Sequence, residues 1–274
     1  MKKKKSPVKV VVPLILAVAA AGVGYKVVNR YIPSKEVMDG NEYFGGEDAA
    51  VVLPDLLEQG KALVKDGTAY VEYATAKENL NDHLYKSDEE QQVILTTAVD
   101  IIKLPYDSNE YTTLTGNGSM PYQIVVSQDG NVYIALDYLA QYTALQYSVE
   151  QEPLHIIINN QWGTKTFSDV IKEESVRLDA DIKSPILKKE ATGDKVTVLE
   201  QEEEWTKVLT ADGYIGYMKS KKLSDSYEEQ VTSDFRAAEY TSIHKDYDMN
   251  LLWHQVTSQD SNDALAADIQ DVKG

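Results

Sequence analysis

The sequence predicts a chain of four parts. These are an N-terminal transmembrane helix, an α+β domain built from an internal repeat, a small all-β barrel, and a C-terminal strand with its helix. Three observations predict this division. A long apolar run follows a group of lysines, two segments 63 residues apart share one pattern, and short alternating strands separated by turn residues fill positions 174–224.

Composition and charge restrict the classes of function. The 274 residues carry 27 basic and 44 acidic side chains, a formal net charge of −17. Eight of the basic residues lie in positions 1–35, which hold no acid, so the remainder is strongly acidic. Nucleic acid is not an expected partner, because phosphate binding needs clustered Lys and Arg. The absence of cysteine excludes disulfides, thiol nucleophiles and thiolate metal sites.

Residues 1–35 predict a basic cytoplasmic tail and a signal anchor. Five lysines precede the apolar run Val10–Tyr25, which reaches Val28 if Lys26 extends its amine to the membrane interface. The lysine excess places the N-terminus inside the cell and the bulk of the chain outside. We therefore expect a single-pass protein of the cell membrane. The alternative is a signal peptide cleaved near Ala19 or Ala21, which would give a secreted protein.

Residues 36–173 contain the internal repeat. Val64–Val71 aligns with Ser127–Ile134, and Val93–Leu95 aligns with Ile156–Ile158 at the same offset of 63. Each copy predicts a strand, an Asp-Gly turn, a strand, a short helix and two more strands. We expect the two copies to share one α+β core. The helix of the second copy is marked by Ile134, Leu136, Leu139 and Tyr142.

This pair of segments resembles the copper amine oxidase N-terminal-like repeat of exported proteins from Gram-positive bacteria. The matching features are the two Asp-Gly-x-x-Tyr turns, at Asp66 and Asp129, and the helix and strands that follow each turn. The family name does not imply copper here, because a copper site needs clustered histidines. The histidines are scattered, so neither a metal nor a cofactor is predicted: they are His83, His155, His244 and His254.

Residues 174–224 predict the small barrel. Alternating segments at Val196–Leu199, Trp205–Val208 and Tyr214–Tyr217 are separated by turn signals. Their order and spacing resemble the bacterial Src homology 3-like domain, which implies binding to peptidoglycan or another cell-wall glycan. The aromatic residues could stack on sugar rings or line a peptide groove, or Trp205 and one tyrosine could close the core of the barrel. The candidate ligand-binding residues are Trp205, Tyr214 and Tyr217.

Residues 225–247 predict an acidic linker, and residues 248–274 predict a strand followed by a helix. The strand Asp248–Val256 is almost continuously apolar, which suits burial on both faces of a parallel sheet. A strand and a helix form half of a βαβ crossover, whose parallel partner must follow. Asn250–Thr257 resembles the first barrel strand of family 18 glycoside hydrolases. The resemblance implies that residues 248–274 are the incomplete start of a (β/α)8 barrel, with the catalytic part downstream.

No catalytic residue is predicted within the chain. The signature of family 18 hydrolases, D-x-x-D-x-D-x-E, ends in the glutamate that protonates the glycosidic oxygen. Neither Asp179–Asp181 nor Asp246–Asp248 is followed by that glutamate, and the common hydrolase, zinc protease and nucleotide-binding motifs are absent as well. The chain as given is therefore predicted not to be an enzyme.

Three functions remain open at the level of sequence. The first is a membrane-anchored, extracellular, non-catalytic region that targets a peptidoglycan or chitin-like glycan hydrolase to the cell wall. The second is a fragment of an active family 18 glycoside hydrolase, which the downstream reading frame would test. The third is a surface sensor or structural protein that binds protein partners. The expected contacts are the cytoplasmic membrane through the N-terminal helix and wall glycan through the barrel, and the oligomeric state is left open.

Overall fold

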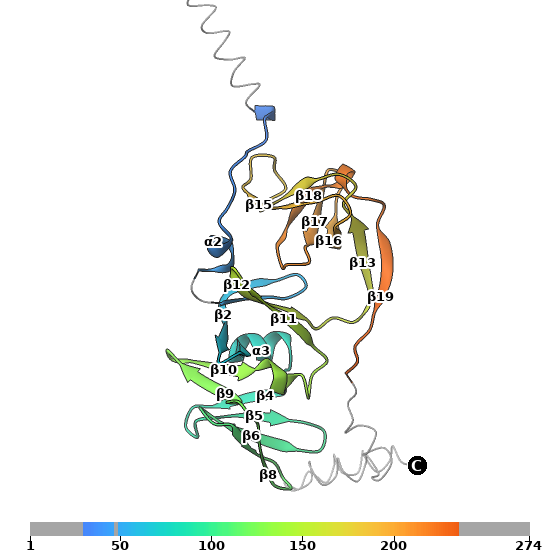
Figure 1. Cartoon of the computed structure of the whole chain (residues 1–274). Helices are drawn as coiled ribbons and strands as arrows, with labels where there is room; N and C mark the ends of the chain where they lie inside the picture. The colour runs from blue at the N-terminus through green and yellow to red at the C-terminus, as the bar shows by residue number, and fades with distance from the viewer. Residues whose placement is uncertain (1–29, 47–48, 236–274) are drawn as a thin grey trace, which may run out of the picture. The chain divides into compact units, whose positions relative to one another are not determined.

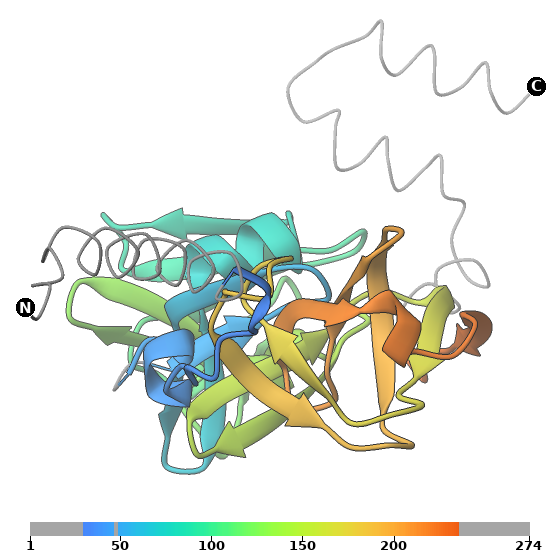
Figure 2. The same cartoon turned by 90° about the horizontal axis from the view of Figure 1, so that it is seen from above.

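The computed structural model describes residues 30–46 and 49–235, which form two compact units (Figures 1 and 2). Unit 1 combines residues 30–43 with residues 165–229. Unit 2 holds the described residues from 44 to 164 together with 230–235. Unit 1 is therefore built from two segments that lie far apart in the chain.

Unit 2 is built mainly of strands in two sheets. The first sheet has the order β11-β12-β1-β2-β3-β10-β9, and the second is the antiparallel meander β4-β5-β6-β7-β8. In the first sheet β1 and β12 run parallel, whereas β2 and β3 are antiparallel. The elements of unit 2 are β1 (Ala49–Val52), β2 (Leu57–Lys65), β3 (Thr68–Glu72), α3 (Tyr73–Asn79), β4 (Leu84–Ser87), β5 (Gln92–Thr96), β6 (Ile101–Pro105), β7 (Glu110–Thr112), β8 (Asn117–Ser119), β9 (Val125–Gln128), β10 (Asn131–Ala135), α4 (Leu136–Leu139), β11 (Gln146–Gln151) and β12 (Leu154–Asn159).

The two copies of the repeat share one order of elements. The series β2, β3, α3, β4, β5 corresponds to the series β9, β10, α4, β11, β12. Both hairpin turns have positive φ at their two central residues: 51° and 79° at Asp66 and Gly67, and 52° and 81° at Asp129 and Gly130. Two-residue hairpin turns require this conformation, and glycine adopts it without steric cost. The Asp-Gly pairs therefore set the register of both hairpins.

The copies differ in the partners of their last two strands. Strands β3 and β10 pair with each other within the first sheet. Strands β11 and β12 join that sheet beside β1, whereas β4 and β5 join the second sheet with β6, β7 and β8. The segment between the copies supplies the strand that pairs with β5. This insertion places equivalent strands of the two copies in different sheets.

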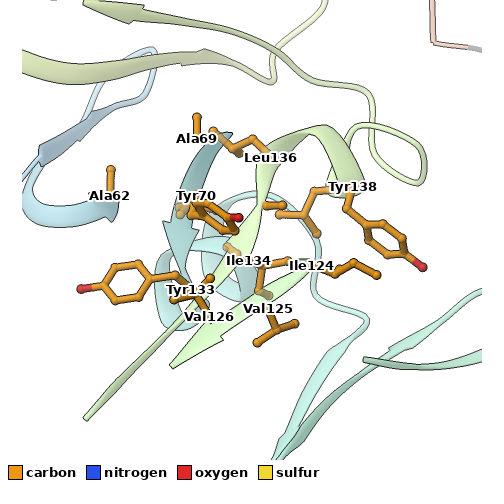
Figure 3. Packing of buried hydrophobic residues seen from close by; sticks show 14 of the residues in the cluster. Ala62, Ala69, Tyr70, Ile124, Val125, Val126, Tyr133, Ile134, Leu136 and Tyr138 are labelled. Carbon is orange, nitrogen blue, oxygen red and sulfur yellow. The ribbon is translucent and has the colours of Figure 1, made fainter. Parts of the chain in front are cut away.

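One hydrophobic cluster joins both sheets of unit 2. It contains Tyr70 and Ile134 from the first sheet and Leu95 and Leu104 from the second, each at most 2% exposed. Figure 3 shows the side chains of Tyr70 and Ile134 among neighbours from β9 and α4. Burial of apolar surface is the main stabilising contribution to such a core. The shared cluster therefore makes unit 2 one folding body rather than two separate copies.

Unit 1 has a single seven-stranded sheet in the order β15-β14-β18-β17-β16-β13-β19. Strands β13 and β19 lie side by side at one end of this order, as both views show (Figures 1 and 2). The sheet therefore extends beyond residues 174–224, and β19 lies in the segment predicted as a linker. The elements are α2 (Gly40–Phe44), β13 (Gly163–Asp169), β14 (Glu174–Arg177), β15 (Ile186–Glu190), β16 (Lys195–Gln201), β17 (Trp205–Leu209), β18 (Ile215–Lys219), the 3-10 helix η1 (Ser220–Lys222) and β19 (Tyr227–Val231).

A glycine allows β18 to approach β14 closely. A Cβ atom at Gly216 would lie 2.5 Å from the carbonyl oxygen of Arg177 and 2.7 Å from Cγ1 of Val176. Non-bonded carbon atoms in well-packed cores lie near 3.5–4.0 Å apart. The close packing of these two strands therefore requires glycine at position 216.

Residues 34–43, which we call the strap, add to the edge of the unit 1 sheet beside β15. The N–H of Ser34 donates to the carbonyl of Ile182 at 2.7 Å, and the N–H of Ile186 donates to the carbonyl of Glu36 at 2.8 Å. The N–H of Met38 donates to the carbonyl of Ile186 at 2.9 Å, and the pairing is parallel. Because the strap both donates backbone hydrogen bonds to this edge and accepts them from it, it pairs with the sheet as an additional strand would.

Side chains hold both ends of the strap. Arg177, which is 6% exposed, donates to the carbonyls of Ser34 at 3.1 Å and Ser184 at 2.7 Å. At the other end, the hydroxyl of Tyr43 donates to the carbonyl of Ile215 at 2.9 Å and accepts from the N–H of Ile215 at 3.0 Å. Buried polar groups are stable only when they are paired. These two side chains therefore fix the strap to strands that lie more than a hundred residues away.

The predicted α+β class is wrong, because the described chain is predominantly strand. The helices within the repeat have seven residues in α3 and four in α4. The pattern Ile134, Leu136, Leu139, Tyr142 predicted a longer second helix. Ile134 instead lies in β10, where it pairs with Val71 of β3, and the N–H of Tyr142 closes a tight turn on the carbonyl of Leu139 at 2.9 Å. The spacing of these residues fits a helix, but strand pairing places the first of them in a sheet.

Two further parts of the predicted fold class fall on residues outside the described ranges. These are the transmembrane helix, placed within residues 10–28, and the start of a (β/α)8 barrel at 248–274. Within 30–46 and 49–235 no helix is long and apolar enough to cross a membrane, and no start of such a barrel is visible. The apolar residues there alternate along short strands instead of forming one long helical run. The predicted fold class and the predicted membrane localisation are corrected accordingly.

We expect Gly216→Ala to destabilise unit 1 by about 1–3 kcal/mol, the usual cost of overpacking a core. The added methyl group would overlap a backbone carbonyl, which cannot rotate away. The matched control is Gly116→Ala, where an added Cβ has no atom within 4 Å. Chemical denaturation of the full chain measures both variants. Equal midpoints for the two variants would contradict the close approach of β18 and β14.

Candidate ligand-binding surface of unit 1

The hairpin β17–β18 carries two of the three predicted ligand-binding residues on one face. In its antiparallel register Trp205 lies opposite Lys219, and Lys207 lies opposite Tyr217. Side chains alternate between the faces of a sheet, and the next position along β17, Val208, is fully buried. The hairpin therefore turns one face to the core and places aromatic and cationic side chains together on the other.

Trp205 is packed rather than open. It is 8% exposed, and the ammonium of Lys219 lies 3.9 Å from the centre of its ring. This is a cation–π distance. The carboxylate of Glu204 lies 3.5 Å from the same ammonium. A ligand would reach the indole ring only after Lys219 moves.

Tyr217 is half-buried and lies between two cationic residues. Its neighbour on β17 is Lys207 and its neighbour on β14 is Arg177. A phenol ring offers a rigid apolar surface with a polar tip, and a nearby cation attracts carboxylates. Arg177 holds the strap, so Lys207 is the neighbour better placed to serve a ligand. This part of the face suits a molecule with both apolar rings and carboxylates.

Tyr214 lies apart from the other two residues, in the turn between β17 and β18. Its N–H donates to Oγ1 of Thr210 at 2.9 Å. Its ring stacks on that of Tyr43, with centroids 5.2 Å apart and an interplanar angle of 27°. Burial raises the pKa of Tyr214. The structure thus groups Trp205 with Tyr217, whereas the strap packs against Tyr214.

A charged cluster near Tyr214 was missed by sequence reasoning. The ammonium of Lys188 lies 2.6 Å from Oδ2 of Asp212 and 3.2 Å from Oε1 of Glu190. Oε1 of Glu190 accepts no hydrogen bond from the described residues, so its contact with Lys188 is an ion pair only. Burial, and then the hydrogen bond with Asp194, raises the pKa of Glu190 to about 7, although Lys188 opposes the shift. The spacing of Lys188 and Glu190 on one strand face was the available signal.

The described histidines do not form a metal site. His83 is exposed, whereas His155 is 2% exposed and stacks on Phe44 with ring centroids 3.7 Å apart. In the part of the chain that the structure describes, no group of three or more His, Cys, Asp or Glu side chains could hold a metal ion. His155 is thus a packed core residue of unit 2.

Two segments of the chain match known families. Residues 175–224 match the bacterial SH3 domain, and residues 55–158 match the copper amine oxidase N-terminal domain. The prediction that the chain carries both domain types is therefore confirmed. These types suggest accessory domains associated with the cell wall and peptidoglycan. Neither match supports the predicted resemblance to family 18 glycoside hydrolases.

The similarity of the chain to whole proteins is slight. No curated protein matches the chain. Among solved structures, the chain is similar to NlpC1 from Trichomonas vaginalis, with 14% identity and a TM-score of 0.21. The similarity covers 52% of this chain and 40% of that protein.

We expect Glu190→Gln to flatten the pH dependence of stability between 4.5 and about 7. In the unfolded chain this carboxyl loses its proton near its ordinary pKa of 4.5, whereas in the folded chain it keeps the proton up to about 7. The folded state then binds more protons, so stability of the wild type falls as pH rises through this window. Glutamine has no proton to lose.

Denaturation midpoints across that pH window measure the effect. The matched control is Glu203→Gln, which removes a carboxylate at an exposed position of the same unit. Parallel stability curves for the wild type and Glu190→Gln would show that Glu190 does not hold its proton in the folded chain.

Proposed function

We propose that the chain is a non-catalytic cell-wall-binding protein whose SH3 domain recognises peptidoglycan. The match of residues 175–224 to the bacterial SH3 domain carries the proposal. The proposed ligand-binding residues are Trp205, Tyr214 and Tyr217, and no catalytic residue, cofactor or metal is assigned. Of the three, Tyr217 is the residue that a ligand would meet first, since Trp205 lies under Lys219 and Tyr214 packs against the strap.

The chemistry of the hairpin face favours this ligand. Peptidoglycan presents sugar rings with apolar faces beside carboxylates of its peptides. Tyr217 can contact a ring while Lys207 and Lys219 attract carboxylates. The net charge of −17 repels an anionic polymer as a whole, so attraction has to come from such local cationic positions.

Unit 2 is proposed as a spacer or a second contact with the wall. Its match to the copper amine oxidase N-terminal domain spans residues 55–158. The hydrophobic cluster shared by its two sheets suits a rigid spacer, because the sheets cannot separate without exposing that core. No metal chemistry is assigned to it.

Two other functions stay predictions. Membership in a family 18 glycoside hydrolase rests on Asp246–Gly274, which lies outside the described residues, and is not part of the proposal. Binding to protein partners alone, as in a surface sensor or structural protein, is the competing function. That function predicts no retention of the chain on purified peptidoglycan.

We expect Tyr217→Ala to weaken retention of the purified full-length chain on insoluble peptidoglycan by about fivefold to tenfold. Truncation of an aromatic anchor at an interface commonly costs about 1–2 kcal/mol or more. The matched control is Tyr85→Ala, which removes a tyrosine that is 50% exposed on β4 of unit 2. Co-sedimentation measures the retained fraction, and circular dichroism checks that both variants are folded.

The outcomes separate the candidate functions. Loss of retention in Tyr217→Ala but not in Tyr85→Ala supports recognition by the SH3 domain. Equal loss in both variants would indicate that the hairpin face is not the principal contact with peptidoglycan. A wild-type chain that stays in solution would overturn the proposed function.

A further inference from the structure

We propose that the strap, residues 34–43, is an intramolecular occupant of the binding surface, and that it must leave β15 and Tyr214 before Tyr214 can contact a cell-wall ligand. The inference rests on the proposed function of unit 1. It adds an autoinhibitory role for a segment that lies outside the match to the bacterial SH3 domain, which begins at residue 175.

The strap occupies two features of unit 1 that become accessible to a ligand only when the strap leaves. One is the backbone edge of β15, where the N–H and the carbonyl of Ile186 bond to Glu36 and Met38 respectively. The other is the ring of Tyr214, on which Tyr43 stacks. An extended peptide binds a sheet edge through backbone bonds and adds specificity through side-chain contacts. The strap occupies its own domain in this same way.

The manner of attachment favours release without unfolding. A strand that belongs to a core buries alternate side chains, but Val37 in the middle of the strap is 65% exposed, and Lys35 and Glu36 are exposed as well. The bonds to β15 are therefore mainly backbone bonds, whose net contribution is modest because water replaces them. The strap joins the sheet through an isolated bridge outside the named strands, so its release breaks no pairing between those strands.

Tyr43 is the main side-chain anchor at the C-terminal end of the strap. It is 6% exposed, and its hydroxyl accepts a hydrogen bond from the N–H of Ile215 and donates one to the carbonyl of Ile215. A phenylalanine at this position would keep the stacking on Tyr214 but lose both hydrogen bonds. Tyr43→Phe therefore weakens the closed state without removing an aromatic side chain from the surface.

We call the strap closed when it is bound to β15 and open when it has left. The apparent affinity for a ligand is proportional to the fraction of molecules in the open state. When only a fraction of molecules is open, the apparent dissociation constant is the intrinsic one divided by that fraction. Weakening the strap should then tighten binding, whereas locking it should abolish the contribution of Tyr214. If the strap were instead part of the binding surface, weakening it would weaken binding and locking it in place would not.

A reversible disulfide lock tests the proposal, because the natural chain contains no cysteine. Val37 and Ile186 are partners in the parallel bridge between the strap and β15, so Val37→Cys and Ile186→Cys are combined in one full-length chain. The probe is peptidoglycan solubilised by a muramidase, and its binding is measured with the lock oxidised and reduced. We expect the oxidised form to bind about tenfold more weakly than the reduced form, because the open state is no longer populated.

A second variant keeps the test valid if the buried Ile186→Cys substitution harms folding. Tyr43→Phe carries no cysteine, and we expect it to bind more tightly than the wild type. The single variants Val37→Cys and Ile186→Cys, treated with the same oxidant, control for effects of oxidation. Binding by Tyr43→Phe that is weaker than wild-type binding would contradict the inference.

Failure of the inference is distinguishable from failure of the proposed function. If the oxidised and reduced forms bind equally well, the strap does not regulate the surface, although recognition of peptidoglycan stands. If no form of the protein binds the fragments, the proposed function is overturned and the role of the strap with it.

Discussion

The contact between Tyr43 and Ile215 joins residues 172 positions apart and holds the C-terminal end of the strap on the unit 1 sheet. A single hydroxyl donates to the carbonyl and accepts from the N–H of the same residue, as a neighbouring strand would. A phenol keeps the proton needed for donation at neutral pH, and burial raises the pKa of Tyr43 further above its ordinary value. Without this contact, a half-buried peptide group at the start of β18 would lose both partners, and the strap would lose the anchor at its C-terminal end.

The SH3 domain is therefore not independent of the rest of the chain. The matched segment, residues 175–224, contains the central strands, but β13, β19 and the strap lie outside it. Its hairpin face holds Trp205 beneath Lys219, with Tyr217 beside Lys207, and its turn holds Tyr214 against Tyr43. Access to these aromatic rings thus depends on a cationic side chain at one place and on a distant segment at the other.

Local features of this fold could be predicted from the sequence, whereas long-range pairing could not. The turns at Asp66 and Asp129 are encoded by adjacent residues, because positive φ at Asp-Gly depends on little else. The placement of Trp205 and Lys207 on one face of a strand is equally local, because side chains two positions apart share a face. No sequence pattern indicated that β4 and β5 would lie in a different sheet from the equivalent strands β11 and β12. That difference depends on pairing with the inserted strands β6–β8. The docking of Tyr43 and the buried carboxyl of Glu190 were missed for the same reason, since each depends on residues brought together only by folding.

Amide hydrogen exchange at Ile186 and Ile215 tests the central claim, that the strap is a separable occupant of the unit 1 sheet, most directly. Both amides donate to the strap, Ile186 to the carbonyl of Glu36 and Ile215 to the hydroxyl of Tyr43. The account predicts that the two amides exchange together and faster than the amides of β17 within the sheet, because the strap opens while the sheet stays folded. Exchange as slow as that of β17 would show that the strap opens only when the whole unit unfolds, and would contradict the account.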